Sequence, residues 1–261
     1  MKILIDSDLE VVYKVGHRCE PVMYYVCGEA IQYKKDAVAY CVKNDIDPDL
    51  ITKEKSYFSL EYTIKVVDEV VEGLVGLIEA RHHGDNQVEH FLTGKENFRK
   101  DADPEYKAHR KDKEKPKYFN EVREHLFKEY SALQVEGLEA DDLIGIRAKE
   151  LRKQGEDYIV ISGDKDLDQI PGLHYNARHK KFYEVTDDEG IRYIWQQMLT
   201  GDAADNVKGI KGIGDKTALK MMLDVKTEDL QELVTRSYKD ADIHGRFDSN
   251  LICLTILQES K

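Results

Sequence analysis

Four short acidic segments, far apart in the sequence, contain the residues best suited to chemistry. They read ILID at the start of the chain, VEGLEADD in the middle, and then ISGDKD and LTGDAADN. Each segment adjoins a short apolar run, which predicts that its carboxylates lie at the end of a strand or at a helix terminus. The candidate residues are Asp6, Glu139, Asp141, Asp142, Asp164, Asp166, Asp202 and Asp205.

Carboxylates that gather in one place need cations. Without them, mutual repulsion raises their pKa values and costs stability. Mg²⁺ and Mn²⁺ prefer oxygen ligands and relieve this repulsion. Two such ions, about 4 Å apart, can activate a water and stabilise the leaving oxygen during phosphodiester hydrolysis. The acidic set therefore predicts a two-metal hydrolytic site that requires no separate nucleophile.

Helix caps and solvated turns are the alternative explanation for acidic residues, because Asp and Glu are common in both. We assign Asp8, Asp168 and the run 187–189 to this class. For the larger set, placement at several strand ends favours the metal site.

Strands and helices that could position these acids alternate up to about residue 187. This order predicts right-handed crossovers and a mostly parallel sheet, with ligand sites outside the carboxyl ends of the strands. Asp6, Asp164 and Asp166 each fall just past such an end. The expected strands are 2–5, 88–92 and 158–162, and the expected helices are 59–80, 119–130 and the segment after Asp142.

The last part of the chain changes character and predicts helices at 191–199, 217–223, 228–236 and 247–257. We therefore expect an α/β core over 1–187, which includes a polar segment at about 95–118. A helical lobe would follow over 188–261. The pattern at 20–57 is irregular and gives no firm assignment.

Closely spaced glycines in NVKGIKGIGDKT, residues 206–217, predict a turn where the backbone approaches a ligand. The helix that begins after it has free N–H groups that can hold a phosphate without reading bases. A simple glycine-rich connector is the alternative, and the spacing is not that of a nucleotide-binding P-loop. The residues expected to contact a nucleic-acid backbone are Gly209, Gly212, Gly214, Lys216 and Thr217.

The polar segment 95–117 is rich in Lys and Arg and has no apolar period, which predicts a loop or arch that becomes ordered on binding. Basic side chains with an aromatic neighbour suit a single nucleic-acid strand, although a solvated charged surface is the commoner meaning of such a run. Its candidate residues are Arg99, Tyr106, Lys107, Arg110 and Lys111.

The composition allows a full hydrophobic core and excludes several classes of protein. The 261 residues are 41% hydrophobic and carry a net charge of −12, so any nucleic-acid binding must depend on local charge. No apolar run could span a bilayer or act as a signal peptide. Four scattered cysteines indicate neither a disulfide framework nor a zinc site. We expect a reduced cytoplasmic protein.

Together, the motifs resemble those of the 5′-nucleases, the family of flap endonucleases and 5′→3′ exonucleases. The similarity includes ILID, YKAHRK, VEGLEADD, ISGDKD and GDAADNVKGIKGIGDKTA, in the same order and at similar spacing. The stand-alone length is most similar to the bacteriophage members. The resemblance implies a PIN-like core with a helical arch and a C-terminal lobe that contains a helix–hairpin–helix motif.

By that resemblance, the eight acids would bind two Mg²⁺ or Mn²⁺ ions. Lys107 and Arg110 would contact the scissile phosphate from the arch, with Arg99 as a further phosphate contact. The hairpin would bind duplex DNA with a K⁺ ion. Family members cut near junctions of single and double strands or at 5′ ends, and several remove RNA primers, so such DNA is the expected partner of a monomeric, membrane-free enzyme.

One departure affects the first metal site. Many relatives have a further metal-binding Asp just after the second strand, where this chain has Thr93-Gly94. We expect an active enzyme with an altered ligand or a water at this position. Two other functions remain open: a catalytically weak accessory protein that binds DNA junctions, and a PIN-like ribonuclease. The glycine hairpin and the helical lobe argue against the ribonuclease.

Overall fold

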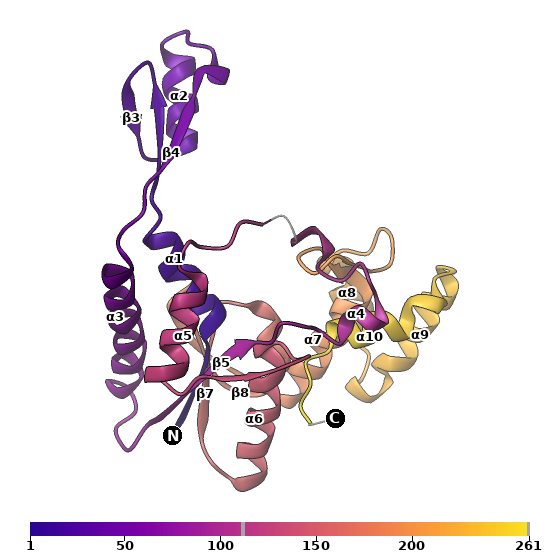
Figure 1. Cartoon of the computed structure of the whole chain (residues 1–261). Coiled ribbons are helices and arrows are strands. Elements are labelled where there is room, and N and C mark those ends of the chain that lie inside the picture. Colours follow the sequence, from indigo (N-terminus) through magenta and orange to yellow (C-terminus); the bar gives the residue numbers. More distant parts are fainter. Residues whose placement is uncertain (111–112, 260–261) are drawn as a thin grey trace.

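A six-stranded sheet forms the centre of the molecule (Figure 1). The computed structural model describes residues 1–110 and 113–259. At the middle of the sheet, β1 (Lys2–Asp6) pairs in parallel with β5 (Gln87–Thr93) and β7 (Tyr158–Ile161). The remaining strands are parallel β6 (Leu133–Val135) and β8 (Gly172–Asn176), and antiparallel β9 (Lys181–Val185), in the order β6-β5-β1-β7-β8-β9.

Helices cover both faces of this sheet. Along β1, Ile3 and Ile5 pack with Ile78 of α3 (Leu60–Glu79), whereas Leu4 packs on the opposite face with Ile144 of α6 (Ala140–Gln154). This alternation is the two-residue period of a strand that is buried on both sides. α1 (Lys14–Arg18) and α5 (Phe119–Glu129) pack beside α3. All parallel strands therefore present their carboxyl ends at one edge, where α6 also begins.

Sequence periodicity predicted the core elements correctly. The helix expected over 59–80 is α3, in which the Ser59 side chain caps the amide of Tyr62. β8 and β9 are additional strands that the pattern did not indicate. Among the described residues, no helix is both long enough and apolar enough to cross a membrane.

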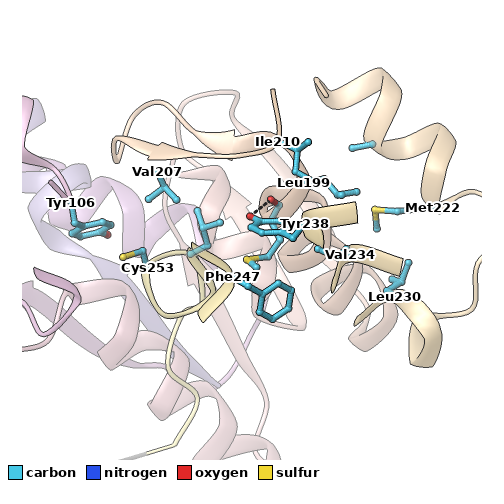
Figure 2. Close-up of a cluster of buried hydrophobic side chains, with 13 residues drawn as sticks. Tyr106, Leu199, Val207, Ile210, Met222, Leu230, Val234, Tyr238, Phe247 and Cys253 are labelled. Carbon is cyan, nitrogen blue, oxygen red and sulfur yellow. Dashed lines mark hydrogen bonds between the residues drawn. The ribbon is translucent and has the colours of Figure 1, made fainter. Parts of the chain in front are cut away.

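The C-terminal helices pack around their own hydrophobic cluster (Figure 2). Within it, the hydroxyl of Tyr238 donates to the carbonyl of Met198 at 2.6 Å. The last predicted helix ends at Leu254 rather than residue 257, because Thr255 adopts an extended conformation.

The division of the chain into a core and a lobe at residue 187 stays a prediction. The elements of this part are α7 (Asp187–Thr200), β10 (Gly201–Asp202), β11 (Val207–Lys208), α8 (Asp215–Met222), η5 (Thr227–Asp229), α9 (Leu230–Asp240), η6 (His244–Arg246) and α10 (Phe247–Leu254).

Residues 22–55, which had no firm assignment, form a small projection that we call the arm (Figure 1). Its three antiparallel strands lie in the order β3-β2-β4. A small core of Val26, Ala37 and Cys41 holds its helix against the sheet. The elements of the arm are β2 (Val22–Val26), β3 (Glu29–Ile31), α2 (Lys34–Lys43), η2 (Pro48–Leu50) and β4 (Thr52–Lys55).

Candidate active site

Asp6 lies at the carboxyl end of β1 and is 5% exposed. Its carboxylate accepts hydrogen bonds from the Leu9 amide at 3.2 Å and the Ser162 hydroxyl at 3.0 Å. The chain then enters η1 (Asp8–Tyr13), a π-helical turn of a kind often found at functional sites. Buried Glu10 of this turn accepts a hydrogen bond from the Gly163 amide at 2.6 Å. Glu10 thus ties the first acidic segment to the third.

The second acidic segment begins α6. Glu139 is the N-cap residue, and its amide donates a hydrogen bond to the carboxylate of Asp142, which completes a capping box. Asp141 lines a cavity of about 580 Å³, together with Asp6 and Asp164. The prediction that carboxylates converge at this helix start is supported for Glu139 and Asp141.

Asp142, a predicted metal ligand, and Arg99, a predicted phosphate contact, are paired with each other in this arrangement. Asp142 is fully buried, and Arg99 is 2% exposed. The guanidinium of Arg99 donates to both oxygens of Asp142 at 2.7 Å. It also donates to the carbonyls of Cys253 and Thr255. These bonds use the whole polar end of Arg99, which therefore joins α4 (Arg99–Ala102) to α6 and to the end of the chain.

The third segment follows β7. Asp164 caps the short helix η4 (Lys165–Gln169) by accepting from the amide of Asp166 at 3.0 Å. Asp166 itself accepts from the side chain of Gln197 of α7 at 2.7 Å. This contact links the acidic loop of the sheet to the C-terminal helices.

The fourth segment is the turn between β10 and β11. Asp202 shapes it by accepting from the amides of Ala204 and Asp205. Its other oxygen lies 3.2 Å from the ammonium of Lys165. The carboxylate of Asp205 receives the side chains of the basic segment, so this turn is where the lobe meets the arch.

The basic segment reaches back to the acids. Lys107 contacts Glu139 and lies 3.4 Å from Asp205, while Arg110 of η3 (Ala108–Arg110) donates to Asp205 at 2.7 Å. Both cations line the cavity, and their contact with a phosphate stays a prediction. Tyr106, which was predicted to bind DNA, is not available to a nucleic acid in this arrangement. Its ring is 1% exposed, and its hydroxyl lies within hydrogen-bond distance, 2.8 Å, of the carboxylates of both Glu139 and Asp205.

Figure 2 shows the ring of Tyr106 beside Val207 and Cys253, at the edge of the lobe's cluster. Burial raises the pKa of the Tyr106 hydroxyl, and the charges of Glu139 and Asp205 raise it further. The hydroxyl therefore stays a donor and bridges the core to the lobe. Lys111, the remaining candidate of this segment, lies outside the described residues.

Burial and mutual repulsion raise the pKa of three acids. Burial is the largest cause for Asp6, whose pKa is about 7, with Asp8 and Asp164 adding to it. Burial followed by the charges of Asp164 and Asp202 raises the pKa of Asp166 to about 7. The pKa of Asp141 lies well above its usual range for the same reasons: burial is the largest cause, and the charge of Asp6 is the largest source of repulsion. Burial opposes ionisation of Glu139, but Lys107 and Arg99 lower its pKa.

This donor set fits hard divalent cations, because crowded oxygens with raised pKa values bind protons that a cation could replace. Within residues 1–110 and 113–259, however, no three potential ligands are already close enough to hold an ion. Glu139, Asp202 and Asp205 are instead paired with Lys107, Lys165 and Arg110. Metal binding would require these ammonium and guanidinium groups to move away from the carboxylates.

The raised pKa values predict a metal effect that depends on pH. In an unfolded chain Asp6 and Asp166 titrate near 4, so between about pH 4 and 7 the folded state binds more protons and loses stability as pH rises. Mg²⁺ should offset this loss. At saturation we expect it to raise the Tm by about 5–10 °C at pH 7.5 and much less at pH 5.5. Calorimetry with Mg²⁺ or EDTA at both pH values tests this, and an equal increase at both would contradict it.

Position 94 explains the missing aspartate. A Cβ there would clash with the backbone carbonyl of Val135, so only glycine fits. The Thr93 hydroxyl accepts from the amide of Ala140 at 3.2 Å, and the Thr93 amide donates to Asp8 at 2.7 Å. Asp8 is 9% exposed and contacts Arg123, so its assignment to a cap or solvated turn is wrong.

Other residues assigned to caps and surface turns are confirmed as such: Glu189 completes a capping box, and Asp187 pairs with Arg152. Sequence reasoning missed several residues that line the cavity. Among them are Tyr13, Phe119 and Arg123, an aromatic and basic wall in which Arg123 contacts Asp8. Tyr13 and Phe119 are in contact, with ring centroids 5.5 Å apart. Nothing in the sequence pattern indicated that the two aromatic residues line a cavity, because aromatic residues at helical spacing usually belong to the core.

The glycine hairpin is an exposed turn that leads into α8. Gly209 packs so closely against Thr200 and Gly201 that no side chain fits, and Gly212 has a φ of +85°. Gly214, Lys216 and Thr217 are exposed. The N-terminus of α8 therefore faces solvent, as the predicted phosphate contact requires.

A sequence model of the family described as "5'-3' exonuclease, N-terminal resolvase-like domain" matches residues 53–195, more than half of the chain. The chain belongs to the 5′–3′ exonuclease family. The resemblance expected from the acidic and glycine-rich motifs is thus confirmed, and with it membership of a family of nucleases.

Two curated relatives of this 5′–3′ exonuclease family member illustrate the similarity. A 5′-3′ exonuclease from Buchnera aphidicola is 41% identical over 96 residues, which cover 33% of this chain and 34% of that protein. A DNA polymerase I from Rhizobium leguminosarum is 35% identical over 162 residues, covering 57% of this chain and 16% of the polymerase. The match thus covers about a third of the exonuclease and a smaller part of the polymerase.

A solved structure confirms the fold of this family member. The T5 5′-exonuclease, described with bound divalent zinc ions, aligns with a TM-score of 0.50 at 17% identity. The alignment covers 97% of this chain and 95% of that protein. The predicted α/β architecture with a mostly parallel sheet is therefore correct.

Proposed function

We propose that this protein is a metal-dependent, structure-specific 5′-nuclease that hydrolyses phosphodiester bonds in DNA. The observation that supports it most is the convergence of Asp6, Asp141 and Asp164 on one cavity that Lys107 and Arg110 also line. DNA is the natural substrate class, because matched relatives include DNA polymerases.

The acids of this site would hold two Mg²⁺ or Mn²⁺ ions, which supply the charge that ionises a water and stabilises the leaving oxygen. In this proposal Asp6, Glu139, Asp141 and Asp164 would hold one ion, and Asp166, Asp202 and Asp205 would hold the other. Lys107 and Arg110 are already within reach of the acids, so an incoming phosphate can replace the carboxylates as their partner. This exchange would free the acids and orient the scissile phosphate in one step.

The exposed glycine hairpin would bind the duplex backbone through the N-terminus of α8, with a K⁺ ion on its carbonyl oxygens. The aromatic and basic wall of Tyr13, Phe119 and Arg123 would contact the single strand. The substrate would then be a junction of single and double strands, or a 5′ end. Flap removal, 5′→3′ exonuclease activity, RNA-primer removal, and a monomeric cytoplasmic enzyme in phage replication are the finer parts of this proposal.

Product-length analysis is the direct test of this function. 5′-Labelled flapped, nicked and blunt duplexes should be incubated with purified protein while Mg²⁺ is titrated. We expect metal-dependent cleavage near the junction, and no cleavage in EDTA. Binding of the flapped duplex in EDTA without cleavage in Mg²⁺ would instead indicate an accessory protein that binds DNA junctions. Preferential cleavage of RNA of the same sequence would indicate a ribonuclease.

Replacement of Lys107 by alanine should slow cleavage far more than it weakens binding. The ammonium lies at the acids and lines the cavity, so it is placed to stabilise charge on the scissile phosphate. We expect a single-turnover rate lower by about 10²-fold, and duplex affinity weaker by less than about fivefold. Lys100→Ala is the matched control, since Lys100 is exposed on α4 and lines no part of the cavity. An unchanged rate in Lys107→Ala would exclude a catalytic role.

A further inference from the structure

The basic segment is attached to the protein at two separate places. The first is the lobe, where the amide of Lys107 donates to the carbonyl of Asp205 at 2.9 Å and Arg110 donates to the carbonyl of Ala204. The second is the root of the arm. There, residues 113–117, which we call the arch exit, run alongside the two chain segments that connect the arm to the core.

Glu20 forms the centre of the second attachment. It is 6% exposed, although it lies at the start of a surface projection. One carboxylate oxygen accepts from the amide of Lys117 in the arch exit, and the other lies 2.6 Å from the ammonium of Lys55 at the end of the arm. Lys55 also lies 3.6 Å from Glu114. A buried carboxylate thus holds an arm residue and an arch residue at once.

Aromatic and proline contacts complete this attachment. The ammonium of Lys117 lies 4.6 Å from the ring centroid of Tyr57, just after the arm. Pro116 is buried against Gly16, where no Cβ could be placed without a clash. The next residue back, Lys115, lines the cavity and lies 4.4 Å from the ring centroid of Phe119. The position of the arch exit therefore fixes one wall of the cavity.

We propose that the root of the arm is the anchor of the arch exit, and that Glu20 is the positioning residue through which it acts. Its role is to keep Lys115 and Phe119 over the cavity, where a substrate strand would pass. This role rests on the proposed nuclease function, but the anchor itself can be measured without any substrate. Through this anchor the arm contributes to substrate affinity. Lys107 and Arg110 are held separately by the lobe, so loss of the anchor should not change the rate of the chemical step.

Limited digestion with trypsin tests the anchor directly, because Lys113 and Lys117 are cleavage sites inside the arch exit. In Glu20→Ala and in Lys55→Met we expect cleavage after Lys117 to become about tenfold faster, since cleavage follows the population of the open form. Lys53→Met is the matched control. Lys53 lies on the same strand opposite Tyr24, and no contact joins it to the arch exit. Digestion rates within twofold of wild type in both test variants, with an unchanged Tm, would overturn the proposal.

A kinetic measurement connects the anchor to function. For cleavage of a 5′-flapped duplex, Glu20→Ala should raise KM by about five- to tenfold and change kcat by less than about twofold. Faster digestion with an unchanged KM would show an anchor with no role in affinity. If no variant and no wild-type protein cleaves DNA, the nuclease proposal fails, and the digestion result still decides the anchor.

Excision of the arm is a second test of the anchor, and it does not require substitution of a buried residue. The amide of Ser56 donates to the carbonyl of Pro21 at 3.0 Å, so a short glycine linker can join these residues in place of 22–55. The shortened protein keeps Glu20 and Tyr57 but loses Lys55. We expect the faster digestion predicted for Lys55→Met and a KM raised in the same direction as in Glu20→Ala. A shortened protein with wild-type values of both would refute an anchoring role for the arm.

Discussion

Replacement of Asp164 by asparagine is expected to reduce cleavage of a 5′-flapped duplex by about 10³-fold, while DNA binding is retained or becomes tighter. Asp164 lines the cavity. Its charge acts on acids of the first, second and third acidic segments, because it raises the pKa values of Asp6, Asp141 and Asp166. As a proposed metal ligand, Asp164 would contribute several kcal/mol of transition-state stabilisation, and its loss corresponds to this change in rate. Loss of a negative charge also lowers the repulsion of phosphate.

Single-turnover kinetics at saturating Mg²⁺ and binding of the same duplex in Ca²⁺ or EDTA measure the two effects separately. Asp168→Asn is the matched control, because Asp168 belongs to the same short helix but accepts a hydrogen bond from Tyr183 and lines no part of the cavity. We expect near wild-type cleavage for it. Cleavage by Asp164→Asn within about tenfold of wild type would remove Asp164 from the set of ligands.

The fold was predictable to the extent that local periodicity determines it. A buried strand such as β1 is a continuous apolar run, and α3 combines a helical period with a serine cap, so both can be identified from a few residues. The arm was not predictable in this way. Its small core joins Val26 of β2 to Ala37 and Cys41 of α2, and β3 and β4 are only three and four residues long, too short to show a period.

The acidic site was only partly predictable, because spacing gives the place of a side chain but not its partner. Asp6, Asp141 and Asp164 follow strands or begin a helix, and the topology of the sheet then brings them to one edge. Arg99 and Tyr106, in contrast, lie in a segment with no apolar period, which is typical of exposed residues. They are buried because their partners, Asp142 and Asp205, come from distant parts of the chain.

The pairing of acidic with basic side chains supports the proposed exchange, in which an incoming phosphate replaces the carboxylates as the partner of Lys107 and Arg110. Lys107 and Arg110 neutralise Glu139 and Asp205 in the structure described here, which limits the repulsion that would otherwise destabilise the cluster. The same cations are the ones expected to meet the scissile phosphate. Stability and the proposed catalysis therefore depend on the same residues at this edge, and Arg99 stabilises the cluster by pairing with Asp142 and by lowering the pKa of Glu139.

Replacement of Arg99 by methionine should strongly lower the stability of the protein. It should leave the number of phosphate contacts between the protein and DNA unchanged. It removes one partner of a buried, doubly hydrogen-bonded pair and leaves the charge of Asp142 unpaired, which typically costs about 3–5 kcal/mol. For a chain of this size the Tm should fall by about 10 °C. The end of the chain should also loosen, because Arg99 holds the carbonyls of Cys253 and Thr255.

Two measurements separate this structural role from the phosphate contact that the sequence predicted. The double variant Arg99→Met with Asp142→Asn should recover part of the lost stability, since the unpaired charge is then gone. The dependence of DNA affinity on salt concentration should keep its wild-type slope in folded Arg99→Met, because a lost phosphate contact would lower that slope by about one. A lower slope with an unchanged Tm would restore Arg99 to the DNA interface, and a double variant less stable than the sum of the single changes would exclude the buried pair as the cause.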